Sequence, residues 1–263
     1  MLWWGMDYTE EIEKIDSVDF SGLKSVKCGD VLMVQILEHE PSSVLKNMLV
    51  SFRESLLCRT KIIEYGEEAH VAFLFSNDYS NRNDHYRCFR NVADLLEERF
   101  EILPNKAIKI GNIRLLPHLF VWYHQIRKVA PPRVAATLSS ILYQRFLDVH
   151  YIMEEIQKKS IRHIVVFCDT HATDCLLVQM AKASGILTTT LQHGQYQFES
   201  PCFRYSHSDF FLAYGKNAIE NTGKYMKQDK YIITGMPHHI NMEISDCIML
   251  NDSRKYVIIM SSS

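Results

Sequence analysis

The sequence predicts an α/β protein: a Rossmann-like parallel sheet with helices on both faces. Short apolar, β-branched runs recur in the second half of the chain, and segments with helical spacing of apolar residues separate them. The runs occupy 161–169, 186–194, 208–215 and 231–237. This alternation is typical of consecutive strand–helix–strand units, whose strands pair in parallel. Ligands of such sheets collect at the carboxyl ends of the strands.

The composition limits the class of protein. The chain has 263 residues, of which 47% are hydrophobic, and this is enough to build a core. The formal net charge of −2 gives no global field for nucleic acid, so we expect no nucleic-acid partner. The seven cysteines are odd in number and contain no CxxC pair, which favours reduced thiols in a cytoplasmic protein. The start of the chain lacks the basic region of a secretory signal.

The first third of the chain is patterned less clearly. Residues 1–30 are acidic and are expected to form an arm or a small element, and the apolar run 31–37 predicts a strand. Pro41 can open a helix. The apolar residues that follow recur at helical spacing and mark one face of that helix. They are Val44, Leu45, Met48, Leu49, Phe52 and Leu56.

Further elements are expected between 61 and 160. Strands are predicted at 61–65 and 71–75, and a polar loop and a helix follow the second of them. For the apolar, aromatic segment 110–129 two interpretations stay open: a peripheral contact with a membrane surface, or a core helix under the sheet. Packing elements on both sides favour the core helix. After Pro131 and Pro132, helical spacing of apolar residues predicts a long helix that leads into the strand at 161.

The predicted sheet contains the strands near 71–75, 161–168, 187–191, 209–213 and 231–234. We therefore expect one domain over 31–240. The apolar run 255–260 predicts a further strand, so 241–263 is expected to be a linker and the first strand of a truncated second domain. No G-x-G-x-x-G or Walker loop is present, so a dinucleotide-binding or P-loop domain has no motif in its favour.

The strand ends carry motifs whose order resembles a known family. Gln192-His193-Gly194 closes one strand, Ser208-Asp209 precedes the next, and Gly235-Met236-Pro237 comes before the last strand. In this order they resemble the N-terminal half of a GT-B glycosyltransferase. They are similar to bacterial enzymes of capsule and cell-wall polysaccharide synthesis, including the CDP-glycerol glycerophosphotransferases. The UDP-N-acetylglucosamine 2-epimerases share the architecture and a related Gly-x-Pro.

The resemblance implies an enzyme that transfers a sugar or sugar-like group from a nucleotide-activated donor to a hydroxyl of a glycan or lipid-linked acceptor. It implies surface polysaccharide synthesis in the cytoplasm, at the inner face of the membrane, with no cofactor and no metal. The second domain would bind most of the donor, so the isolated chain is expected to be inactive. Two alternatives remain: a stand-alone α/β binding module without catalysis, and a sugar-nucleotide epimerase.

His193 is the candidate catalytic base. Imidazole titrates near working pH, and the strand end faces the ligand crevice. The resemblance assigns the matching histidine this role; the alternative is a turn histidine that bonds a neighbouring carbonyl. Asp169 ends the preceding strand and could orient an imidazole or bind a sugar hydroxyl. The alternative, a helix N-cap, is somewhat favoured for Asp169.

The remaining candidates are polar residues near the same edge, proposed to bind substrate. They are Gln192, Gly194, Gln195, Tyr196, Asn77, Asp78, Arg82, His171 and His238. For Asn77, Asp78 and Arg82 the alternative is an ordinary polar loop, and for His238 it is an exposed linker. His171, Asp174 and Cys175 share one helical turn, but without a second cluster they do not predict a metal site.

Overall fold

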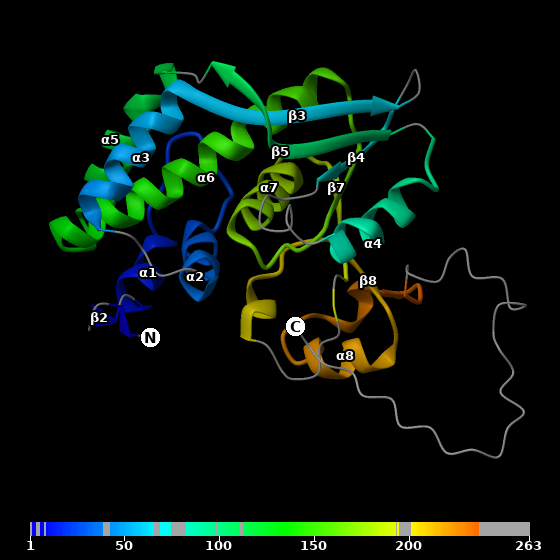
Figure 1. Cartoon of the computed structure of the whole chain (residues 1–263). Coiled ribbons are helices and arrows are strands. Elements are labelled where there is room, and N and C mark those ends of the chain that lie inside the picture. Colours follow the sequence, from blue (N-terminus) through cyan, green and yellow to red (C-terminus); the bar gives the residue numbers. More distant parts are fainter. Residues whose placement is uncertain are drawn as a thin grey trace, which may run out of the picture.

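The computed structural model describes residues 2–3, 6–7, 9–38, 43–65, 69–74, 83–97, 99–110, 113–192, 194 and 201–236. Its central element is a seven-stranded sheet of order β3-β5-β4-β6-β7-β8-β9 (Figure 1). The strands are β3 (Leu57–Tyr65), β4 (Val71–Leu74), β5 (Arg99–Ile110), β6 (His163–Val166), β7 (Leu187–Leu191), β8 (Phe210–Ala213) and β9 (Tyr231–Ile233).

Neighbouring strands from β5 to β9 run parallel, and only the edge strand β3 pairs antiparallel with β5. The strands β4, β6, β7, β8 and β9 are neighbours in chain order. These are the five strands that the sequence predicted in one sheet, so the α/β fold with a parallel sheet is confirmed. β1 (Leu2–Trp3) and β2 (Met6–Asp7) form a separate two-stranded sheet.

Helices cover both faces of the sheet, as predicted. Side chains of a strand alternate between the two faces. Accordingly Leu74 and Val166 belong to the larger core, under α2 (Cys28–Glu38), α6 (Pro132–Lys158) and α7 (Ala172–Ala183). Phe73 and Val165 point to the opposite face. There they pack with Phe89 of α4 (Asn83–Ala93), whose ring meets Phe73 edge-on at 5.5 Å between centroids. A third cluster lies beneath β8 and α8 (Lys216–Thr222), next to η3 (Pro201–Tyr205).

The strand predicted at 31–37 is wrong, because this run lies within the helix α2. Val31, Leu32 and Val34 are all fully buried. A helix that is buried on most sides is apolar nearly all round, and a short apolar run of this kind cannot be told from a buried strand by periodicity. The preceding helix α1 (Thr9–Ile15) buries Ile12 and Ile15 in the same core.

Two helices form an outer layer on α6. They are α3 (Val44–Leu56) and α5 (Leu116–Ile126), and η2 (Ile113–Leu115) leads into α5. The helix predicted within 110–129 is therefore present, but it packs on α6 rather than directly under the sheet (Figure 1). Trp122 of α5 is fully buried there, and its ring lies 5.1 Å from that of Phe146 in α6.

Helix α3 is rotated about its axis so that its polar side, and not its apolar stripe, faces the protein. The apolar stripe of an amphipathic helix normally faces the core. Here Asn47, Ser51 and Ser55 are buried against α6, and the leucines of the stripe are exposed. Polar contacts hold this arrangement: Ser55 Oγ lies 2.9 Å from the Tyr143 hydroxyl, and Ser51 Oγ donates to a carbonyl of α6 at 3.3 Å. Across the described part of the chain, no helix is both long and apolar enough to cross a membrane.

Candidate functional site

The strand order locates the crevice in which a ligand is expected. From β4 the chain passes to β5 on one side of it, and later returns to β6 on its other side. This reversal between β4 and β6 is the topological switch point, where open α/β sheets bind ligands at the carboxyl strand ends. Residues 167–171 follow β6 at this point. The candidates Asn77, Asp78 and Arg82 follow β4 and lie outside the described residues.

Gln192 fixes the turn at the carboxyl end of β7. Its side chain is almost completely buried, with Nε2 donating to the Gly194 carbonyl at 2.6 Å. Its Oε1 accepts the backbone N–H of Tyr214 at 2.7 Å. The amide predicted to bind a sugar hydroxyl is thus engaged internally, joining the end of β7 to the end of β8. His193 lies between Gln192 and Gly194 in the sequence, but outside the described residues, as do Gln195, Tyr196 and His238.

Three neighbouring strands end in glycines with open space around them. Gly194, Gly215 and Gly235 follow β7, β8 and β9, and a Cβ added to any of them would meet no atom of the described residues within 4 Å. Only Gly235, with a φ of +80°, has a left-handed backbone that favours glycine. Gly215 is extended, so its conformation suits any residue. Among the described residues, no atom therefore crowds the backbone at these three positions after the strands.

Tyr214, which directly follows β8, contacts helix α4. Its hydroxyl lies 3.2 Å from the sulfur of Cys88, a buried residue of α4. Burial, together with the Cys88 contact, raises the pKa of the Tyr214 phenol. The phenol is consequently neutral at physiological pH and acts as a spacer between α4 and the strand end.

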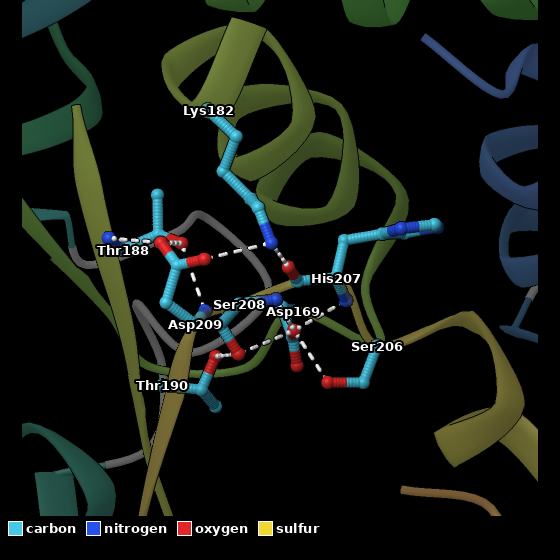
Figure 2. Close-up of polar contacts among 8 residues, drawn as sticks. All are labelled: Asp169, Lys182, Thr188, Thr190, Ser206, His207, Ser208 and Asp209. Atoms are coloured by element: carbon cyan, nitrogen blue, oxygen red, sulfur yellow. Dashed lines mark hydrogen bonds and ion pairs between the residues drawn. The ribbon is translucent and has the colours of Figure 1, made fainter. Parts of the chain in front are cut away.

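Asp169 is completely buried, and one of its oxygens accepts four hydrogen bonds (Figure 2). Oδ2 accepts from the hydroxyls of Ser206 at 2.6 Å and Ser208 at 2.8 Å. It also accepts the backbone N–H groups of His207 and Ser208, each at 3.0 Å. Within the described part of the chain, Oδ1 has no hydrogen-bond partner. The carboxylate therefore anchors the segment that leads into β8.

The alternative role of Asp169 as a helix cap is not observed. The N-cap position of α7 belongs to His171, which makes no side-chain cap hydrogen bond. Asp174, in the first turn of α7, is fully buried and accepts the backbone N–H of Cys168 at 3.3 Å. His171 is partly exposed and follows β6 at the switch point, and its predicted role in substrate binding stays a prediction. Among the described residues, no three His, Cys, Asp or Glu side chains are grouped so that they could hold a metal ion.

The polar network of Asp169 continues along the segment 206–208 to Asp209 and Lys182. Asp209, just before β8, accepts from Thr188 through both the backbone N–H and the hydroxyl, at 3.0 and 2.9 Å. Lys182 of α7 pairs with Asp209 at 2.8 Å and donates to the His207 carbonyl at 2.7 Å (Figure 2). These contacts tie the carboxyl end of α7 to the amino-terminal ends of β7 and β8. They were not predicted, although Ser208-Asp209 stood out in the sequence.

The charge of Asp209 is expected to make stability depend on pH. Burial opposes its ionisation, but hydrogen bonds from Lys182 and Thr188 outweigh burial and lower its pKa. The resulting stabilisation is present above the unfolded pKa of about 4 and is lost as pH falls through the folded value. Asp209→Asn should therefore cost about 1–2 kcal/mol at pH 7 and clearly less near pH 3.

Urea unfolding of both proteins at the two pH values measures this difference. Asp229→Asn, at an exposed carboxylate in η4 (Gln228–Lys230), is the control and should change little at either pH. An equal cost of Asp209→Asn at pH 7 and pH 3 would show that its charge does not contribute to stability.

Comparison of this chain with protein-family models, with curated proteins and with solved structures found no match. The basis for inferring a function is therefore the geometry of the carboxyl edge. There the described residues provide an open glycine edge, a fixed turn after β7 and a partly exposed His171 beside the switch point.

Proposed function

We propose that this protein is the acceptor-side half of a GT-B-type glycosyltransferase. It would bind a glycan hydroxyl that receives a sugar or sugar-like group from a nucleotide-activated donor. The observation that carries the proposal is the space that the described residues leave at Gly194, Gly215 and Gly235, which follow three successive strands on one side of the switch point of a parallel sheet. Glycine has no side chain, so it lets a hydroxylated sugar ring approach the backbone closely, where N–H and C=O groups can bond to the hydroxyls.

The chemistry of the neighbouring sequence supports a glycan better than a dinucleotide. The loop after β4 contains Asn77, Asp78 and Arg82 and lacks the glycine fingerprint that cradles a pyrophosphate. Gln195 and Tyr196 add an amide and a phenol after β7. Amide, carboxylate, guanidinium and hydroxyl groups are the partners that sugar hydroxyls need.

Two residues of the turn after β7 have distinct roles in this proposal. His193 is the base that takes the proton from the acceptor hydroxyl as the new glycosidic or phosphodiester bond forms. Gln192 is a positioning residue in this proposal, because its amide bonds Gly194 and Tyr214, and Gln192 and Gly194 flank His193 in the sequence. Stabilisation of the departing nucleotide belongs to the donor half, through helix N-termini and polar side chains.

Ligand binding to this chain tests the proposal directly. The probes are short oligosaccharides of hexoses and N-acetylhexosamines and oligomers of glycerol phosphate, followed by amide chemical shifts. At least one probe should shift the resonances of residues 167–171, 192–194 and 214–216. Gly215→Leu fills the open edge, so it should weaken that binding about tenfold or more. Gly215→Ala, which adds only one methyl group, should have a smaller effect.

The melting temperature of both variants should stay close to that of the wild type, because Gly215 is extended and surrounded by open space. Absence of any shift with every probe would refute a glycan site. Unchanged binding by Gly215→Leu would place the site elsewhere on the molecule.

A further inference from the structure

Helices α3 and α5, with η2, present an apolar surface to solvent. We call it the outer apolar face. The exposed side chains that form it are Leu45, Leu49, Phe52, Leu56, Ile113, Phe120 and Val121. The rings of Phe52 and Phe120 lie 6.4 Å apart and join the two helices into one surface. Contiguous apolar surfaces of this kind are rare on soluble monomers and usually mark an interaction site.

The exposure of these side chains follows from how α3 packs. Its buried side is polar and satisfied: the Gln144 amide donates to the Asn47 carbonyl at 3.2 Å and to the Ser51 hydroxyl at 3.1 Å. Turning α3 to bury its leucines would break these contacts and leave polar groups unpaired. The helix is thus held with its apolar stripe outward, and Leu45 remains 69% exposed.

The charged residues of the segments that form the outer apolar face are almost all basic. Segments 43–56 and 113–133 contain six basic residues and one acidic residue, Glu54, whereas the whole chain has 29 basic and 31 acidic residues. All six basic side chains are exposed: Lys46, Arg53, Arg114, Arg127, Lys128 and Arg133. Glu54 is paired with Arg53 at 2.6 Å. Exposed apolar side chains beside basic ones are the combination that binds an anionic membrane surface.

We propose that the outer apolar face docks on an anionic lipid bilayer, with α3 and α5 lying along the interface and not crossing it. The apolar side chains enter the region between headgroups and acyl chains, and the basic side chains meet lipid phosphates. A second copy of this chain fits the face less well, because pairing would bring two positive surfaces together. The proposal goes beyond glycan binding and does not depend on it, since the face lies on α6 and not at the strand ends.

Sedimentation with vesicles tests the proposal. Vesicles of phosphatidylcholine with phosphatidylglycerol should bind the protein, vesicles of phosphatidylcholine alone should bind it much less, and 1 M salt should weaken the binding. Leu49→Ser should lower the partition coefficient about tenfold, because one leucine no longer enters the interface. The control is Leu95→Ser after α4, since Leu95 is 64% exposed and Leu49 is 60% exposed; it should bind like the wild type.

The charge contribution is tested separately. Lys128→Glu should weaken binding to the anionic vesicles about fivefold or more, whereas Lys227→Glu, at another exposed lysine, should not. Sedimentation velocity without lipid tests whether a second copy of this chain binds the outer apolar face instead. A dimer that Leu49→Ser dissociates would assign the face to a second copy and overturn the proposal. Equal binding to neutral and anionic vesicles, or equal effects of Leu49→Ser and Leu95→Ser, would overturn it as well.

Discussion

Asp169→Ala is expected to destabilise the fold by about 3–5 kcal/mol, which is a large share of the 5–15 kcal/mol typical of a domain. The carboxylate is fully buried, and its Oδ2 accepts two backbone N–H groups and two hydroxyls of the segment 206–208. Without it, the N–H groups of His207 and Ser208 lose their acceptor inside the protein. Each buried donor left unpaired costs about 1–3 kcal/mol.

Urea unfolding measures this cost. Asp169→Asn keeps an acceptor oxygen of the same size, so it should cost clearly less than Asp169→Ala. Asp229→Ala removes an exposed carboxylate and should stay within about 0.5 kcal/mol of the wild type. If Asp169→Ala melted like the wild type, Asp169 would not be a structural anchor, and its predicted role beside a substrate would regain support.

The parts of the fold that were predicted correctly are those in which local pattern and tertiary burial agree. The strands β4, β6, β7, β8 and β9 are short runs of apolar and β-branched residues, and β4, β6 and β7 are buried at most of their positions, as strands covered on both faces are. The run 31–37 satisfies the same pattern, yet it forms part of α2, because a helix that is buried on most sides is apolar nearly all round. Local pattern alone cannot separate these two cases.

Which side of α3 is buried cannot be decided from the periodicity of its sequence alone. Its leucines form a regular apolar stripe, but Asn47, Ser51 and Ser55 recur every four residues on another side. Small polar residues at this spacing allow close approach to a neighbouring helix, and Ser140 and Tyr143 of α6 provide the matching groups. The pattern was present in the sequence, whereas the partner helix that decides between the two sides is known only from the structure.

At the candidate site, the roles of polar side chains likewise depend on contacts that the sequence does not show. Asp169 was expected at a strand end, but the donors that engage it come from 206–208, far along the chain. Lys182 meets Asp209 across a separation of 27 residues, between α7 and the start of β8. Polar residue types at a strand end therefore indicate an edge of interest. They do not distinguish a carboxylate that binds a ligand from one that holds the fold together.

His193→Gln is expected to lower transfer by the complete enzyme about 10²–10⁴-fold, the usual contribution of a positioned base. Glutamine is similar in size and can still form hydrogen bonds, but it cannot take a proton from the acceptor hydroxyl. The turn itself should persist, because Gln192 holds it through Gly194 and Tyr214. The melting temperature should therefore stay close to that of the wild type, while the rate of sugar transfer falls.

The control is His124→Gln at an exposed histidine of α5, which should leave transfer unchanged. Gln192→Leu is expected to behave differently. It removes the hydrogen bonds of the Gln192 amide to Gly194 and Tyr214, so it should lower both the melting temperature and the rate of transfer. If His193 only bonded a carbonyl within its turn, His193→Gln would transfer nearly as fast as the wild type. A strong loss of transfer in His193→Gln, with melting unchanged, is the outcome expected of an imidazole that accepts the proton of the acceptor hydroxyl.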